Sequence, residues 1–157
     1  MAKNLNERSI VMKHEILIYN KTRRRVPEKL IKLIILGALQ FLKLKQPVGL
    51  AILVVDQAEI KMLNKVWRKK GEIPDELSFG LNSRPSAGGV KFAKDNNGVL
   101  ALGEIVVNAD KIFNKKYLSK ILVHSLLHLL GYHHEKSEKQ AKNMEALEEK
   151  ILKYLKI

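Results

Sequence analysis

The sequence predicts one α/β (α+β) domain over residues 1–157, with helices packed on a central, mostly four-stranded mixed sheet. Three observations support this fold class. Segments with strand character alternate along the chain with segments of helical periodicity. One segment, "VGLAILVVD", is almost continuously apolar, as is typical of a strand buried on both faces. The length of 157 residues suits one core, and we find no internal repeat or interdomain linker.

Four segments are predicted to form the strands. Residues 14–20, "HEILIYN", are rich in β-branched and aromatic residues and lead into a basic turn. The apolar run covers residues 48–56, a short strand is expected at 76–82, and "VLALGEIVVN" covers 99–108. Between the last two, residues 82–97 are rich in Gly, Ser, Asn and Pro, which predicts a long loop.

Four further segments are predicted to form helices. The first follows Pro27, a residue suited to a helix start, and its small and apolar residues recur at three- and four-residue spacing: Leu30, Leu33, Ile34, Gly37, Ala38, Phe41 and Leu42. The second covers residues 57–71 and is expected to stop at Gly71. The third and fourth cover residues 117–131 and 138–155.

The composition excludes several classes of protein. The chain has no cysteine, so it forms no disulfide and no thiolate metal site. The first twenty residues lack the continuous apolar region and the cleavage site of a signal peptide. No apolar run reaches the roughly 18 residues of a membrane span. We therefore expect a cytoplasmic protein without a membrane partner.

The net charge points to a polyanionic partner. Lys and Arg number 29 against 16 Asp and Glu, a formal charge of +13. Such an excess favours nucleic acid, because neutralised phosphates release their counterions. Basic residues concentrate at Lys21–Arg25, Lys65–Lys70 and Lys111–Lys120. The alternative is that this charge serves solubility alone.

A histidine-rich segment, "HSLLHLLGYHH", carries the most specific signal in the chain. His124 and His128 are four residues apart, so on a helix both rings project from one face. Gly131 can end the helix and reverse the chain, which would carry His134 to a third position around one metal ion. The pattern H-x-x-x-H-x-x-G-x-x-H shares its ligand spacing with the metzincin zinc signature. Three imidazoles leave a fourth position open for water, as in catalytic zinc sites.

The other two histidines are assigned differently. We expect His133 outside the metal's ligand set, because adjacent residues point in different directions. His133 could instead replace His134, contact a ligand without binding the metal, or lie in solvent. His14, alone in a predicted strand, is taken as structural.

The residue after the first histidine disfavours peptidase chemistry. Zincin peptidases carry a glutamate there as general base, whereas this chain has Ser125. Serine cannot act as that base at neutral pH. A three-histidine zinc ion can still lower the pKa of its bound water to about 7 and polarise a phosphoryl oxygen.

These residues resemble the YbeY-type rRNA maturation factors, a family of single-domain metal-dependent endoribonucleases. The core signature is similar to "VHSLLHLLGYHHE" at 123–135. "LNKVWRKKGEIPDELSF" at 63–79, "LGEIVVN" at 102–108 and "MEALEEKIL" at 144–152 resemble further family segments in the same order. The resemblance spans residues 48–155.

The chain departs from the family pattern at several positions. Ser125 stands where the family usually has glycine, and His133 where it usually has aspartate. In the arginine segment, Trp67 replaces tyrosine, Pro74–Asp75 replaces a longer run, and Glu76 replaces valine.

The resemblance implies a single-strand-specific endoribonuclease that matures ribosomal RNA at the 3′ end of 16S rRNA and takes part in ribosome quality control. It implies one Zn²⁺ ion at the histidines with its bound water as nucleophile. The expected partners are rRNA precursors and ribosomal particles, with no DNA. The family's arginine corresponds to Arg68, whose guanidinium would hold phosphate oxygens and offset charge that grows during attack.

Roles for the neighbouring residues follow from the same reading. Trp67 is expected in the core, with base stacking as the alternative. Ser78 and Phe79 are expected to shape the pocket floor. Glu104 and Glu135 are the candidates for the proton acceptor.

Two alternative functions remain open at this point. The chain could be a non-catalytic RNA-binding factor of ribosome assembly whose metal is structural, which the missing zincin glutamate favours. It could also hydrolyse a small phosphate ester, which the large positive charge disfavours. A water or a fourth protein ligand on the metal would separate catalysis from a structural role.

The charge generates a first prediction. If the +13 charge binds RNA, affinity for single-stranded RNA should fall steeply with added salt. Neutralising Arg23–Arg25 or Lys69–Lys70 should flatten the slope of log affinity against log salt concentration. Binding titrations at several salt concentrations measure this slope, and a salt-independent affinity would leave the charge as a solubility device.

Overall fold

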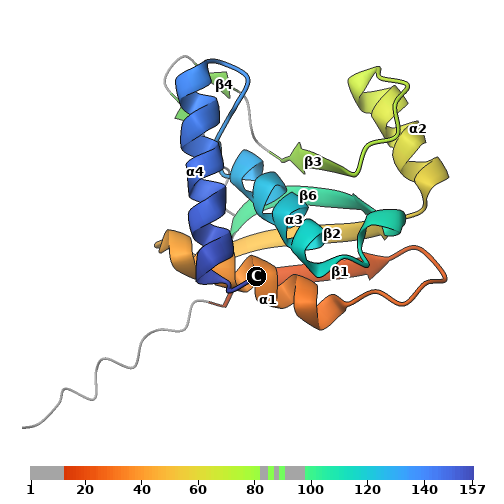
Figure 1. Cartoon of the computed structure of the whole chain (residues 1–157), viewed down its shortest axis with the longest axis horizontal. Coiled ribbons are helices and arrows are strands. Elements are labelled where there is room, and N and C mark those ends of the chain that lie inside the picture. The colour runs from red at the N-terminus through yellow and green to blue at the C-terminus, as the bar shows by residue number, and fades with distance from the viewer. Residues whose placement is uncertain (1–12, 82–84, 87–88, 91–97) are drawn as a thin grey trace, which may run out of the picture.

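A four-stranded mixed sheet runs through the centre of the protein (Figure 1). The strand order is β1 (Glu15–Asn20), β2 (Val48–Val55), β6 (Leu100–Asn108) and β3 (Glu76–Gly80). The first three strands are parallel, and β3 is an antiparallel edge strand on β6. The computed structural model describes residues 13–81, 85–86, 89–90 and 98–157. The predicted α+β fold with a mixed sheet is confirmed.

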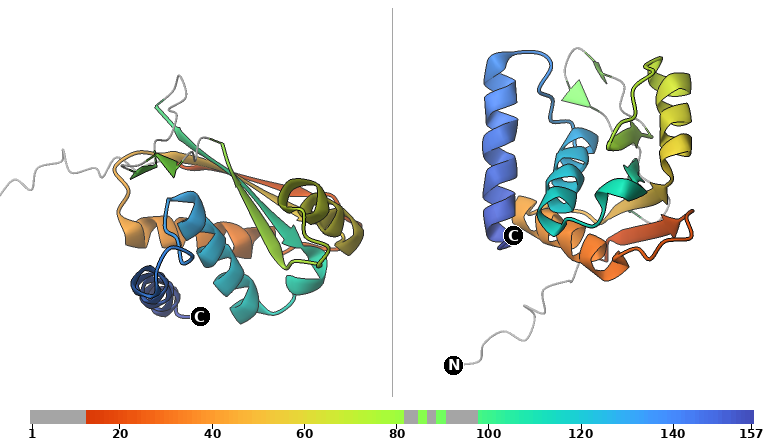
Figure 2. Two further views of the ribbon diagram at one scale, coloured as in Figure 1. Left: turned by 90° about the horizontal axis from the view of Figure 1, so that it is seen from above. Right: turned by 45° about the vertical axis from the view of Figure 1, so that its right-hand side comes forward.

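Over the residues that the structure describes, four α-helices pack around the sheet: α1 (Glu28–Leu42), α2 (Gln57–Arg68), α3 (Lys115–Leu129) and α4 (Glu138–Tyr154). Figure 2 shows α1, α3 and α4 gathered on one side of the sheet. Helix α1 links the parallel strands β1 and β2, because such a pair needs a long crossover connection. None of the helices in the described ranges combines the length and the apolarity needed to cross a membrane.

Strand β2 is fully buried on one face, whereas the other face is half-buried except at Val55, so the predicted burial on both faces holds only in part. Leu50, Ile52 and Val54 face the main core, which α1, α3 and α4 cover. Val55 faces a smaller core on the other side, where Ile60 of α2 packs. Helix α2 therefore covers the sheet face opposite to the other three helices.

Strand β6 carries an irregularity at Gly103 that affects both of its neighbours. On the β2 side, Gly49 pairs with Ala101 but Leu50 pairs with Gly103, so the register between β2 and β6 shifts by one residue. Gly103 has φ +133°, and a Cβ there would lie 2.0 Å from the carbonyl oxygen of Phe79. Only glycine allows this contact between the two strands.

The end of α2 differs from the prediction. The helix ends at Arg68, and Lys69 rather than Gly71 takes the left-handed conformation, with φ 55°. The reason is Asn64, whose carbonyl accepts from the N–H of Lys69 and whose side chain donates to the carbonyl of Glu72 at 3.0 Å. This buried amide holds the turn without glycine.

The remaining boundaries differ less. Helix α3 begins at Lys115, two residues earlier than expected, because the side chain of Asn114 accepts from the N–H of Tyr117 at 3.0 Å. A 3₁₀ turn (Ala109–Lys111) follows β6. Within the stretch expected as a loop, β4 (Pro85–Ser86) pairs with β5 (Gly89–Val90), and the rest of residues 82–97 lies outside the described ranges.

Candidate metal centre and cleft

The three histidines predicted to bind a metal ion come together at one end of α3. His124, His128 and His134 each offer a ring nitrogen, and these nitrogens all lie within 4.8 Å of one another. The ring centroids of His124 and His128 are 4.5 Å apart, and those of His128 and His134 are 4.9 Å apart. The two Nε2 atoms of His124 and His128 are separated by 2.9 Å. Such a group could hold a metal ion.

The local backbone explains this convergence. The helical spacing places His124 and His128 on one face. After the helix, Gly131 takes φ 99° and its N–H donates to the carbonyl of His128 at 3.0 Å. The N–H of Tyr132 donates to the carbonyl of Leu127 at 2.9 Å, which completes the reversal. The turn predicted at glycine therefore brings His134 back beside the helix.

His133 lies at the edge of this group. Its ring centroid is 6.4 Å from that of His128, and it is absent from the set whose ring nitrogens converge. Its side chain lines the same hollow as the other three histidines. His14 stands elsewhere, at the start of the sheet, where its Nδ1 accepts from the N–H of Val48 at 3.0 Å.

A carboxylate on α4 orients the first histidine. Nδ1 of His124 is hydrogen-bonded to Glu148, a residue only 9% exposed, and its Nε2 faces His128. The hydrogen bond to Glu148 raises the pKa of His124, against the opposing effect of burial. A carboxylate behind a histidine fixes the ring and makes its free nitrogen a better metal ligand. Glu148 was not predicted from the sequence, although it lies in the segment that resembles the family's closing helix.

Burial and the neighbouring histidines lower the pKa of His128 to about 4. Its imidazole is therefore neutral at pH 7, which leaves a lone pair free for a metal. A buried neutral imidazole, a second imidazole held by a carboxylate and a third from the following turn make a donor set that fits zinc.

The histidines open onto a cleft between α3 and the edge of β3. Two adjoining hollows, of about 470 and 330 Å³, share Arg68, Lys70, Glu76 and His124 as lining residues. We call the two together the histidine cleft. Lys120 of α3 lines its other end, so three cationic side chains and the histidine group face one space.

Arg68 reaches the cleft from the last turn of α2. Its Nη2 donates to the carbonyl of Ser78 at 3.5 Å, across the edge of β3. Ser78 lines the cleft beside the histidines, as expected for a residue of the pocket floor. Arg68 thus shares one cavity with histidines that lie 56 or more positions further along the chain.

A second carboxylate in the cleft was also missed. The hydroxyl of Ser125, fully buried on α3, donates to Glu76 of β3 at 2.6 Å. Both positions depart from the family pattern, and the two departures contact each other. These two departures from the family pattern are the signal that could have predicted the contact between Ser125 and Glu76, because a buried hydroxyl needs a hydrogen-bond partner.

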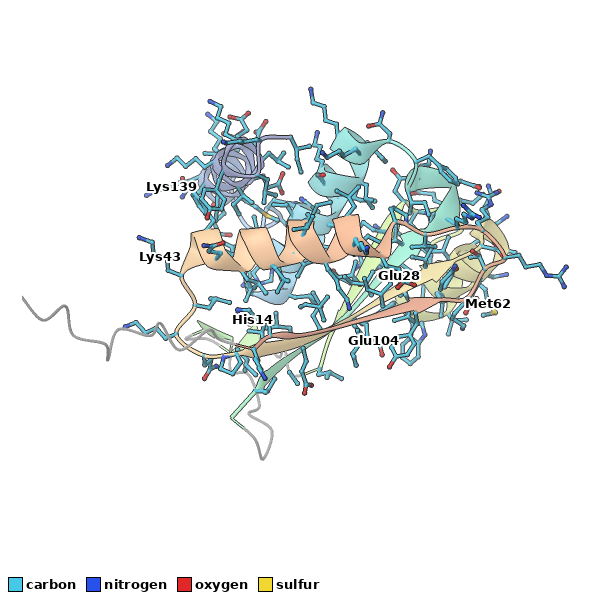
Figure 3. The ribbon with its side chains drawn as sticks, turned by 90° about the horizontal axis from the view of Figure 1, so that it is seen from below. His14, Glu28, Lys43, Met62, Glu104 and Lys139 are labelled. Carbon is cyan, nitrogen blue, oxygen red and sulfur yellow. The ribbon has the colours of Figure 1, made fainter. Side chains whose placement is uncertain are left out.

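Three expectations for neighbouring residues are wrong. Glu104 lies on the face of the sheet away from α1, as Figure 3 shows, and lines a separate hollow with Trp67 and Phe79. Glu104 is therefore too remote from the histidine group to act as the proton acceptor there. Phe79 does not line the cleft, because neighbouring strand residues point to opposite faces. Trp67 is 68% exposed and is not a core residue.

The geometry agrees with a comparison to known protein families. The family model "Endoribonuclease YbeY" matches residues 17–156. The chain belongs to the endoribonuclease YbeY family. The match covers the sheet except the first two residues of β1, and includes the arginine at the end of α2 and the histidine segment.

Individual relatives support this assignment. The chain is 40% identical over 117 residues to the endoribonuclease YbeY of Thermodesulfovibrio yellowstonii, covering 68% of this chain and 67% of that protein. It is 32% identical over 152 residues to that of Aquifex aeolicus, covering 91% and 93%. A solution structure from Thermotoga maritima is similar, with a TM-score of 0.55, 25% identity, and 89% and 88% of the two chains covered.

The contact between His124 and Glu148 generates a prediction. If the histidines hold a metal ion, Glu148→Ala should weaken its binding by about 10- to 100-fold, tested here with zinc, because the ring of His124 loses the carboxylate that orients it. Competition against a chelating dye measures the affinity, and a thermal melt checks folding. Glu149→Ala is the matched control, since that residue is the exposed neighbour on α4. Equal zinc affinities in the two variants would contradict the orienting role.

Proposed function

We propose that this protein is a metal-dependent endoribonuclease that cleaves single-stranded RNA and matures ribosomal RNA, with processing of the 3′ end of 16S rRNA and ribosome quality control as its roles. One observation carries the proposal: three convergent histidines open onto a cleft that Arg68 and Lys70 also line. The chain's membership of a family named for endoribonuclease activity agrees with it. Its partners would be rRNA precursors and ribosomal particles in the cytoplasm, with neither DNA nor membrane.

The metal would be one zinc ion held by His124, His128 and His134. When bound, zinc lowers the pKa of a coordinated water and polarises a phosphoryl oxygen. Within the described residues the group contains these three ligands and no fourth one. A three-ligand set supports a catalytic site over a structural one, which would close the fourth position with protein.

Arg68 would bind the phosphodiester. Its guanidinium presents paired N–H donors that match two phosphate oxygens, and its charge offsets the charge that grows during attack. Lys70 and Lys120 line the same cleft and would hold the neighbouring phosphates as point charges. The +13 net charge supports this choice of a polyanionic substrate.

The proton acceptor would be a carboxylate of the cleft. Glu135 lines it beside His133 and His134, so it keeps the role that the sequence suggests. Glu76 lines it as well, but one of its oxygens accepts from Ser125. Among the described residues, Glu135 makes no hydrogen bond or ion pair and lies beside the histidines, which favours it for this task.

The ligand assignment generates a prediction. His124→Ala, His128→Ala and His134→Ala should each lose bound zinc, because each removes one of three converging nitrogens. His133→Ala is the matched control and should keep full occupancy, since its ring stands outside that set. Metal content per protein molecule is the measurement. Zinc retained in His134→Ala and lost in His133→Ala would reverse the assignment.

The role of Arg68 generates another prediction. Arg68→Ala and Arg68→Lys should each lower the cleavage rate by about two orders of magnitude, because lysine lacks the bidentate geometry. Both should keep wild-type zinc content and melting temperature, because within the described part of the chain the Arg68 side chain makes a single, long hydrogen bond, to Ser78. The assay is cleavage of a structured ribosomal RNA fragment.

Lys61→Ala is the control for the loss of one cation from α2, since this exposed residue does not line the cleft. Wild-type cleavage in both Arg68 variants would remove that residue from the reaction. Zinc binding and RNA binding without any cleavage by the wild type would instead support the non-catalytic assembly factor.

A further inference from the structure

A second hollow lies on the opposite face of the sheet, between α2 and the strands. Its volume is about 280 Å³, and its floor is formed by Leu53, Leu63, Phe79 and Val106. Trp67 of α2 forms one wall. We call this hollow the tryptophan pocket. The histidine cleft uses none of these side chains.

Trp67 presents an aromatic surface to solvent at this pocket. The residue is 68% exposed, and its ring centroid lies 6.3 Å from that of Phe79 at an interplanar angle of 63°. An edge-on contact of this kind holds an indole in place while leaving much of its surface uncovered. A large aromatic fixed over an apolar floor suits a flat, stacking ligand.

The pocket and the histidine cleft lie on opposite faces of the sheet at its edge strand, β3. Trp67 and Arg68 are consecutive at the end of α2, and one lines the pocket while the other lines the cleft. Phe79 and Ser78 are likewise consecutive on β3, where Phe79 lines the pocket and Ser78 lines the cleft. Since β3 is an edge strand, a polymer crossing that edge can occupy both sites at once.

The charges around the pocket favour a nucleotide base inside it and the phosphate backbone outside it. Lys65 and Lys69 are exposed within two residues of Trp67, which supplies cations for phosphates outside the pocket. Inside, Glu104 contributes an exposed carboxylate, and Lys21 is already paired with Glu59 at 2.5 Å. A carboxylate repels phosphate but accepts a hydrogen bond from the amino group of an adenine, cytosine or guanine base.

We propose that the tryptophan pocket binds one unpaired base of the RNA strand whose phosphate lies at Arg68. Trp67 stacks on this base, and Glu104 accepts from its amino group. The inference rests on the proposed function, because the strand enters the pocket from the histidine cleft. A base inside a duplex is already stacked and paired and cannot enter, so the pocket selects single strands.

The chain has one tryptophan, so its fluorescence reports this site directly. Zinc-loaded protein is mixed rapidly with short oligoribonucleotides, and quenching is recorded before cleavage. Single-stranded oligo(A) and oligo(C) should quench the signal, and oligo(U) should bind more weakly because uracil has no amino group. The same strands annealed into duplexes should leave the signal unchanged. Equal quenching by single strands and duplexes would overturn the proposal.

Substitutions test the contact independently of fluorescence. Trp67→Ala should raise the Kd for single-stranded RNA by about 5- to 150-fold, the loss expected for one stacked base. Trp67→Phe should restore most of the affinity, and Glu104→Gln should reduce the preference for oligo(A) and oligo(C) over oligo(U). Phe113→Ala is the matched control, since Phe113 is equally exposed, at 68%, and lines neither site. Anisotropy of labelled RNA measures binding in all variants.

The outcomes distinguish this inference from the proposed function. Wild-type affinity in Trp67→Ala, together with lost cleavage in Arg68→Ala, would overturn the base pocket and leave the nuclease proposal standing. Binding that depends on Trp67, with no cleavage by the wild type, would support the pocket and overturn the nuclease proposal. Unchanged melting temperatures confirm that the variants are folded.

Discussion

The burial of helix α3 is the constraint on which the candidate site depends. The helix packs against β3, α1 and α4, and nine of its fifteen residues are buried. A helix enclosed in this way cannot rotate, so its polar side chains need partners where they stand. His124 finds Glu148 on α4, and Ser125 finds Glu76 on β3. The histidines are therefore held by the same packing that closes the core.

The edge strand β3 contributes side chains to two different hollows, one on each face of the sheet. Its alternating side chains send Glu76 and Ser78 toward α3 and Leu77 and Phe79 toward α2. Helix α2 ends beside this edge, so consecutive residues of the helix also divide between the two faces. Gly103 of β6 permits the close approach that sets the position of β3. The cleft and the pocket are thus products of one strand and one helix end.

Much of the fold was predictable because the deciding signals are local. The apolar run of β2 and the helical spacing of α1 predicted the layers correctly. The errors came where a distant or unusual contact decided the outcome. Helix α2 ends at Arg68 because Asn64 holds the turn that follows, and Trp67 stays exposed although its ring contacts that of Phe79. Glu104 was misplaced because the register shift beside it could not be anticipated from alternation.

The sequence by itself determined the histidine group. The spacing of His124 and His128 on a helix and the reversal at Gly131 depend on backbone geometry over eleven residues, and both appear in the structure. Only the tertiary structure decided which distant side chains surround that group. Glu148, Glu76 and Arg68 come from three other elements, and their approach depends on how helices pack against a twisted sheet. Local spacing carries no information about such contacts, because they join residues far apart in the chain.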